Sequence, residues 1–236
     1  MKKLHASDEK TSFVARARGL YTAVMNERLL RLYDCLPSGN GYKVRLLFAH
    51  LGIRYERVEV DVYSRVTRTP AYLAKNPNGR IPMIELPSGD RLTESNAILL
   101  HFAEGTRLLP EDRWKRAKVL EWLFYEQYEH EPTIASVRFW KHTHIDEERR
   151  VALPRKEAAG YAALTLMDRH LAEHDFFVGG FSIADIALYA YTHVAGEGGF
   201  ELARFPAVER WLARVAAQPG HVPITFPGDV WTTFAP

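Results

Sequence analysis

The sequence predicts an α/β domain with the element order β-α-β-α-β-β-α, followed by an all-α domain. Up to about residue 105, segments in which apolar and polar residues alternate, as in strands, are interspersed with segments in which apolar residues recur at helical spacing. Beyond Pro110 only the helical spacing is found. The length of 236 residues also suits two small domains better than one large core.

The α/β half opens with a β-α-β unit. Residues 29–33 form a short apolar run, a loop rich in proline and glycine follows at 37–41, and apolar residues recur at helical spacing over 44–51. Valines then alternate with acidic residues over 58–62, which is typical of a second strand. Two strands joined through a helix are expected to pair in parallel, with a right-handed crossover.

A short helix, a hairpin and a further helix complete this half. Thr69 and Pro70 are typical of a helix start. Residues 83–86 and 91–93 flank a turn-forming Pro-Ser-Gly-Asp sequence, which predicts an antiparallel hairpin. Ser95 is expected to cap the helix that follows.

The second half is predicted to be a helical bundle. One long helix begins near Trp114, Pro132 is expected to bend or end it, and Pro154 is expected to open another helix. Ser182 and Asp185 form the pattern of a helix cap before an apolar stretch, which we expect to be the central helix of the bundle.

The expected domain limits are 29–109 and 110–236, with residues 1–28 as a loose N-terminal extension. This extension has basic residues but no apolar core of signal-peptide length, so we expect a cytoplasmic protein. A single cysteine, Cys35, excludes disulfides within the chain and metal sites built from several cysteines, and it fits a reducing compartment.

Charge and hydropathy exclude several classes of partner. The 31 lysines and arginines nearly balance the 29 acidic residues, so no overall field favours nucleic acid or an anionic membrane. No apolar run reaches the ~18 residues of a spanning helix. We expect no metal either, because His142 and His144 lack a nearby third ligand and such pairs are typical of surfaces.

The loop at 37–41 is the first candidate site. It leads into a helix, and backbone amides with a hydroxyl at a helix start favour an anion such as a thiolate. Ser38 and Asn40 are the polar side chains there. The alternative is that one is a mere helix cap and the other a mere turn former.

Two further features fit a peptide ligand. Ile81-Pro82 follows a turn and enters a strand, so it is a candidate cis peptide, at which the displaced backbone of Ile81 pairs with an extended peptide. At Glu94-Ser95, amides and a hydroxyl at a helix start would bind a carboxylate, while the glutamate would hold an ammonium group. The alternative for Ser95 is a simple helix cap.

The stretch from Leu29 to Pro110 resembles the N-terminal domain of cytosolic glutathione transferases, including bacterial ones. The resemblance rests on PSGNGYKVR at 37–45, NPNGRIP at 76–82 and ESNAIL at 94–99. FSIAD at 181–185 resembles the buried helix cap of the family's C-terminal domain, so the likeness covers nearly everything after residue 28. It implies the glutathione transferase fold, a thioredoxin-like βαβαββα domain with a helical bundle behind it, and a homodimer.

The resemblance also implies roles for single residues. Ser38 matches the hydroxyl that activates the glutathione thiol in serine-type members, and Asn40 lies near the active cysteine of bacterial cysteine-type members, so both are candidate thiol donors. Ile81, beside Pro82, would pair with the cysteinyl part of glutathione. Glu94 together with Ser95 would bind the γ-glutamyl group.

Two basic residues complete the candidate glutathione site. Lys43, one turn into the first helix, and Arg80, beside the proline, are candidate partners of the glycine carboxylate of glutathione. The alternative is that both are solvated surface charges.

Aromatic and titratable residues on the first long helix form the candidate pocket for a small electrophile. Tyr125, Tyr128, Arg138 and Trp140 are the residues assigned to it. By resemblance to bacterial members, this region borders the electrophile site, and its polarity favours a charged substrate or a second glutathione. The alternative is that the rings belong to the bundle core and the charges to its solvated face.

The expected activity is that of a glutathione transferase, in which the activated thiol attacks an electrophilic small molecule, a reaction typical of detoxification. Two alternatives stay open: a glutathione-dependent disulfide or peroxide reductase of the same fold, and a non-catalytic binding protein of this family. Cys35 and Ser38 form a Cys-x-x-Ser sequence, but the serine takes the helix-entry position, so Cys35 is expected to pack at the strand end.

Overall fold

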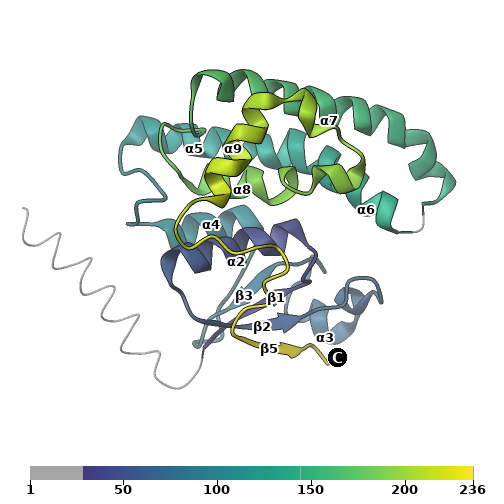
Figure 1. Cartoon of the computed structure of the whole chain (residues 1–236). Helices are drawn as coiled ribbons and strands as arrows, with labels where there is room; N and C mark the ends of the chain where they lie inside the picture. Colours follow the sequence, from purple (N-terminus) through teal and green to yellow (C-terminus); the bar gives the residue numbers. More distant parts are fainter. Residues whose placement is uncertain (1–28, 144, 236) are drawn as a thin grey trace, which may run out of the picture.

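The computed structural model describes residues 29–143 and 145–235 (Figure 1). Within them, a mixed sheet of five strands in the order β4-β3-β1-β2-β5 lies below a layer of helices. The expected extension at 1–28 and His144 of the candidate histidine pair lie outside the described residues.

The β-α-β unit is confirmed, with its second strand at 55–59 instead of the expected 58–62. Strand β1 (Leu30–Asp34) leads through helix α2 (Gly39–Leu51) to strand β2 (Tyr55–Glu59), and β1 pairs with β2 in parallel. Gly52 ends α2 in the left-handed conformation, with φ 64°, where glycine carries no steric penalty.

The hairpin is also confirmed. After the short turn η1 (Val66–Arg68) and helix α3 (Pro70–Leu73), strands β3 (Met83–Glu85) and β4 (Arg91–Thr93) pair antiparallel. The Ile81-Pro82 peptide bond is cis, as expected.

The predicted cap of helix α4 (Ser95–Ala103) was wrong. Glu94 occupies the N-cap position, with φ 67° and ψ 111°, and Ser95 is the first residue of the helix. The hydroxyl of Ser95 bonds to side chains of α2 instead of to its own helix, so it is not available as a cap.

Two prolines lie within helical segments of the second domain. The interruption expected at Pro132 is a π-helical segment, η2 (Glu126–Ala135), between α5 (Arg113–Tyr125) and α6 (Ser136–His142), rather than an end of the helical path. The wider turn tolerates a residue that lacks an amide donor and crowds the preceding turn. Pro154 lies within α7 (Glu147–Glu173) rather than at its start. No helix in the described ranges is both long and apolar enough to cross a bilayer.

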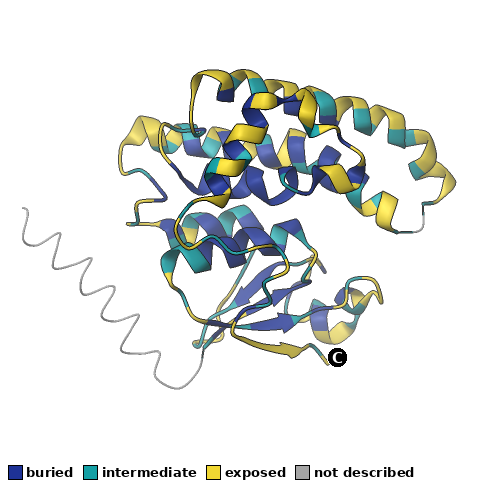
Figure 2. Cartoon of the chain, viewed as in Figure 1, coloured by how far each residue is buried: buried dark blue, intermediate teal, exposed yellow. Residues whose placement is uncertain are grey.

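Helix α8 (Ile183–Thr192) is the expected central helix, buried along its whole length (Figure 2). Ser182 and Asp185 form the predicted capping box, and the Asp185 carboxylate also accepts a bond of 3.0 Å from the indole of Trp211 in α9 (Pro206–Ala216). The short turns η3 (Ala195–Gly198) and η4 (Leu202–Arg204) lie between α8 and α9. Because α8 packs on both α2 and α9, it fixes the helical layer against the α/β layer.

The end of the chain differs from the all-helical segment expected for 110–236. After α9 the chain returns to the α/β layer, and β5 (Val230–Thr233) pairs in parallel with β2 (Figure 1). The Tyr42 hydroxyl donates to the carbonyl of Val222 at 2.6 Å, and the amide of Phe234 donates to the carbonyl of Glu59 at 2.8 Å. This tail, residues 217–235, therefore completes the sheet of the first domain.

Arg45 of α2 is the fully buried cation that joins these parts. Its Nε donates to the equally buried carboxylate of Asp34 at 2.8 Å, and its Nη2 donates to the carbonyl of Leu36 at 2.5 Å. Its Nη1 donates to the tail carbonyls of Ile224 at 2.6 Å and Phe226 at 2.8 Å. One guanidinium thus links the end of β1, the loop before α2 and the tail.

Replacing Arg45 with methionine should lower the free energy of unfolding by about 3 to 5 kcal/mol, because Asp34 would be left as a buried carboxylate without its partner. Urea unfolding of the two proteins measures the difference. The matched change Arg116→Met removes an ion pair with Glu104 whose side chains are 38% and 61% exposed, and it should cost less than about 1 kcal/mol. Equal losses in the two variants would contradict the role given to Arg45.

Candidate active site

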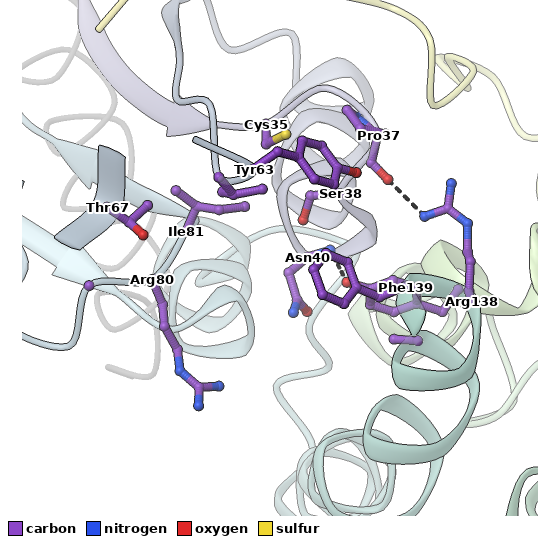
Figure 3. Close-up of a pocket in the computed structure, with 14 residues that line it drawn as sticks. Cys35, Pro37, Ser38, Asn40, Tyr63, Thr67, Arg80, Ile81, Arg138 and Phe139 are labelled. Atoms are coloured by element: carbon purple, nitrogen blue, oxygen red, sulfur yellow. Dashed lines mark hydrogen bonds between the residues drawn. The ribbon is translucent and has the colours of Figure 1, made fainter. Parts of the chain in front are cut away.

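A cavity of about 300 Å³ opens where the start of α2 faces the helical layer (Figure 3). The α/β domain contributes the loop before α2 and the segment that leads into β3, while α6 and α8 form the opposite wall. Five of the predicted site residues line it: Ser38, Asn40, Arg80, Ile81 and Arg138.

Ser38 is the N-cap of α2. Its hydroxyl oxygen accepts a bond of 3.3 Å from the amide of Gly41, which satisfies one of the free amides at the helix start. The hydroxyl hydrogen takes no part in this bond, and Ser38 lines the cavity. The residue therefore acts as a cap and also faces the cavity, so the two interpretations of Ser38 are not exclusive.

The side chain of Asn40 is held from three sides. Its Oδ1 accepts from Nζ of Lys43 at 2.8 Å and from the hydroxyl of Ser95 at 3.2 Å, and its Nδ2 donates to Glu131 at 3.4 Å. Its backbone amide donates to the hydroxyl of Tyr191 at 3.2 Å. These contacts fix the orientation of the amide group at the cavity wall.

Lys43 was expected either to bind the glycine carboxylate of glutathione or to be a solvated surface charge. Both predictions were wrong, because its side chain is not exposed. Its side chain is fully buried and forms an ion pair of 2.7 Å with the equally buried Glu126 of η2. Nζ also donates to Ser95 at 3.3 Å, and Glu126 accepts from Asn96 at 3.0 Å. A buried charge is tolerated only when paired in this way, so Lys43 serves to hold Asn40 and the domain interface.

The segment that leads into β3 is anchored by contacts to its backbone. The carbonyl of Arg80 accepts from the Tyr72 hydroxyl at 2.8 Å and from Asn76 Nδ2 at 2.7 Å. Ile81 follows it and lies before the paired residues of β3, which begin at Met83. Glu94 is exposed at the start of α4.

Cys35 lines the cavity but is only 3% exposed. Burial, together with the negative charges of Glu59 and Asp34, raises the pKa of its thiol to about 12. A buried thiol that is held in its protonated form is a poor nucleophile. Across the described parts of the chain, no cluster of histidine, cysteine and carboxylate side chains could hold a metal ion.

Only one of the four residues assigned to the electrophile pocket lines the cavity. Arg138 does so, and it donates to the carbonyl of Pro37 at 2.9 Å and to Glu197 at 2.6 Å (Figure 3). Trp140 lies under Lys156, whose ammonium group is 5.4 Å from the ring centroid, and it does not line the cavity.

The two tyrosines of that prediction also lie elsewhere. The Tyr125 hydroxyl donates to the carbonyl of Ala163 at 2.9 Å within the helical layer, and Tyr128 is 80% exposed to solvent. Tyr125 is the last residue of α5 and Tyr128 lies in η2, and neither side chain lines the cavity.

Three aromatic residues at the cavity were missed by the sequence analysis. Tyr63 and Phe139 stack across its mouth, with ring centroids 6.2 Å apart and planes inclined by 17°. Tyr191 reaches the cavity from the buried helix α8. The signal available for Tyr191 was chemical: the hydroxyl of a tyrosine in a helix that is apolar nearly all round needs a hydrogen-bond partner.

The comparisons with known proteins agree with this architecture. Residues 29–104 match the glutathione S-transferase N-terminal domain family, and residues 122–219 match the glutathione S-transferase C-terminal domain family. The chain belongs to the glutathione S-transferase family, and the expected thioredoxin-like domain with a helical domain behind it is confirmed.

Individual relatives point to more than one use of this fold. A glutathione S-transferase structure from Pseudomonas fluorescens is 48% identical, with a TM-score of 0.80, covering 83% of this chain and 98% of that one. A glutathione transferase from Burkholderia graminis with two glutathione molecules bound per subunit is 28% identical, with a TM-score of 0.71, covering 82% and 85%. The disulfide-bond oxidoreductase YfcG of Escherichia coli is 29% identical over 192 residues, or 78% of this chain and 88% of the relative.

His130 of η2 makes the stability of this region depend on pH. Its Nε2 lies 2.8 Å from the Thr192 hydroxyl, and burial together with the charge of Lys43 lowers its pKa to about 3. In the unfolded chain His130 binds a proton near the ordinary histidine pKa of 6.5, whereas in the folded chain it does so only near pH 3. Stability is therefore full above about pH 6.5 and is lost as the pH falls toward 3.

Between pH 7 and pH 5 the free energy of unfolding should fall by about 2 kcal/mol from this residue alone. His130→Gln keeps a hydrogen-bonding group but removes the titration, so urea unfolding of this variant should lose that part of the pH dependence. His101→Gln, at an exposed histidine of α4, should leave it in place. The same slope in wild type and His130→Gln would show that His130 does not cause it.

Proposed function

We propose that this protein is a glutathione transferase in which bound glutathione, and not a protein cysteine, supplies the nucleophilic thiol. The observation that carries the proposal is the Ser38 hydroxyl at the start of α2, on the wall of the cavity. The buried thiol of Cys35, with its raised pKa, supports a sulfur brought by the ligand. The Burkholderia graminis relative has glutathione bound.

Glutathione would lie extended across the α/β domain. The backbone of Ile81 pairs with its cysteinyl part, and the guanidinium of Arg80 is available to the glycine carboxylate at the edge of the cavity. The γ-glutamyl carboxylate would bind the free amides at the start of α4, with the exposed Glu94 near its ammonium group. The hydroxyl of Ser95 takes no direct part in this proposal, because it is committed to Asn40.

The thiol then lies at the start of α2. The helix dipole and the Ser38 hydroxyl favour its ionised form, and each unit by which they lower its pKa corresponds to about 1.4 kcal/mol. The proton leaves to solvent, and the thiolate attacks an electrophilic carbon held in the cavity. We assign the donor role to Ser38 over Asn40, because the amide group of Asn40 is engaged by Lys43, Ser95 and Glu131.

A second candidate is glutathione-dependent disulfide reduction. The bound thiolate would attack one sulfur of a disulfide, the S–S bond would break, and the leaving thiolate would take a proton from solvent. Arg138 on the cavity wall suits a second anionic peptide. The relative YfcG is named a disulfide-bond oxidoreductase. A binding protein without activity is less favoured, because it needs no hydroxyl at the thiol position.

We also propose a homodimer that acts in the cytoplasm. Phe124 and Tyr128, on α5 and η2, are 71% and 80% exposed, and a second copy of the chain would shield such aromatic side chains from water. The lone buried thiol of Cys35 fits a reducing compartment.

Ser38→Ala should lower kcat about tenfold or more while glutathione-agarose still retains the protein, because the thiolate loses a donor but the peptide contacts stay. Cys35→Ala should leave kcat within about twofold, since that thiol stays protonated. A panel of electrophiles and disulfides, assayed with both variants, measures this. Failure of the wild type to bind glutathione would refute the proposal, and loss of activity only in Cys35→Ala would indicate a protein nucleophile.

Arg138→Met separates the two candidate reactions. If a second glutathione moiety binds across the cavity, the KM for glutathione disulfide should rise about tenfold while the KM for an uncharged electrophile changes little, because only the anionic substrate loses a charged hydrogen bond. Lys141→Met, on the same helix but paired with Glu157, is the control. Equal changes for both substrates would remove the support that Arg138 gives to the disulfide reaction.

A further inference from the structure

Tyr191 brings the helical domain to the thiol position. The residue lies near the end of α8, is 7% exposed, and lines the same cavity as Ser38 and Asn40. Its hydroxyl oxygen is 3.2 Å from the backbone nitrogen of Asn40, in the first turn of α2. The sequence analysis treated this helix as packing alone.

The first turn of α2 is arranged around two hydroxyl groups. The amide of Gly41 donates to the Ser38 hydroxyl at 3.3 Å, and the amide of Asn40 donates to the Tyr191 hydroxyl at 3.2 Å. Each amide uses a lone pair of its hydroxyl oxygen and leaves the hydroxyl hydrogen to another acceptor. A hydroxyl that accepts a hydrogen bond is also a stronger donor, because such chains polarise one another.

The approach of Tyr191 to α2 depends on Gly39. A Cβ atom at this position would lie 2.5 Å from Cε1 of the tyrosine ring, so any other residue would push the ring away. The ring projects from α8, and every residue of this helix is buried, so the backbone that carries the ring is also fixed. The hydroxyl is thus fixed at the helix start before any ligand arrives.

We propose that Tyr191 is a second hydroxyl donor to the glutathione thiolate, acting beside Ser38. This inference rests on the proposed function, because it takes the glutathione sulfur to lie at the start of α2. The amides of Asn40 and Gly41 then act on the sulfur through the two hydroxyls. The thiol proton goes to solvent, and Tyr191 keeps its own proton throughout.

The surroundings of Tyr191 keep its phenol protonated. Burial raises its pKa most and the nearby carboxylate of Glu131 raises it further, while the hydrogen bonds with the Asn40 amide and the Ser38 hydroxyl lower it. Two more charged groups face it: Glu126 from η2 and, on α2, Lys43, whose Nζ is 5.9 Å from the ring centroid. A phenol in this environment donates a hydrogen bond and does not act as a base.

The cavity side completes the set of charges near this hydroxyl. Arg138 of α6 and Arg80, ahead of β3, line the same cavity as Tyr191. Both are cations and would themselves favour an anionic sulfur, so the test must isolate the contribution of the single hydroxyl.

Tyr191→Phe removes that hydroxyl and keeps the ring against Gly39. Tyr189→Phe is the matched control, because Tyr189 is a buried tyrosine of the same helix whose hydroxyl lies 3.2 Å from Nε2 of His221 and which does not line the cavity. The thiol pKa of bound glutathione is followed by its ultraviolet thiolate absorbance during a pH titration. Affinity for S-methylglutathione, which has no ionisable thiol, reports on the intact peptide site.

For Tyr191→Phe we expect the thiol pKa to rise by about one unit and kcat/KM near neutral pH to fall about tenfold, with the affinity for S-methylglutathione unchanged. Tyr189→Phe should match the wild type in all three measurements. An unchanged thiol pKa in Tyr191→Phe would overturn the inference. Weaker binding of S-methylglutathione with no change of thiol pKa would also overturn it, because it would show a packing role only.

These outcomes are distinct from failure of the proposed function. Wild-type protein that binds neither glutathione nor S-methylglutathione would refute that function. Wild-type protein that binds glutathione with a lowered thiol pKa, combined with an unaffected Tyr191→Phe variant, would refute only the role of Tyr191.

Discussion

The buried pair of Arg45 and Asp34 is the interaction on which the rest of the structure depends. The Asp34 carboxylate ends β1 and accepts the amide of Cys35 at 2.7 Å, and a Cβ atom at Gly41 would lie 1.5 Å from its Oδ1. The same pair therefore fixes the position of the end of β1, of the loop that carries Ser38 and of the first turn of α2. Burial raises the pKa of Asp34 to about 6, and the guanidinium offsets part of that cost.

A second buried network connects this frame to the helical domain. Lys43 and Glu126 form an ion pair across the domain boundary, and Asn40 and Glu131 continue the network to the cavity. Such a network favours a single arrangement of its polar groups. In any other arrangement a buried polar group would lose its partner, which costs free energy. The same contacts therefore determine the position of Asn40 and the packing of the two domains against each other.

The elements of the α/β domain could be predicted because each has a local signal, such as the glycine that ends α2 or the proline at the start of α3. The candidate site was predictable where it is formed by short stretches, at Ser38 and at Ile81. It was not predictable where distant residues meet. The partner of Lys43 is 83 residues away in the sequence, and no local signal shows that Phe139 of α6 lines the cavity whereas Trp140 does not.

The tail strand has a consequence for the synthesis of the chain. Because β5 forms the outer edge of the sheet next to β2, the first domain lacks a strand until residues 230–233 have left the ribosome. Until then β2 is an open edge, able to pair with other extended segments. The α/β domain is thus completed only after the helical domain has been made, and the pairing of β2 with β5 is a contact of long sequence separation, of the kind that slows folding.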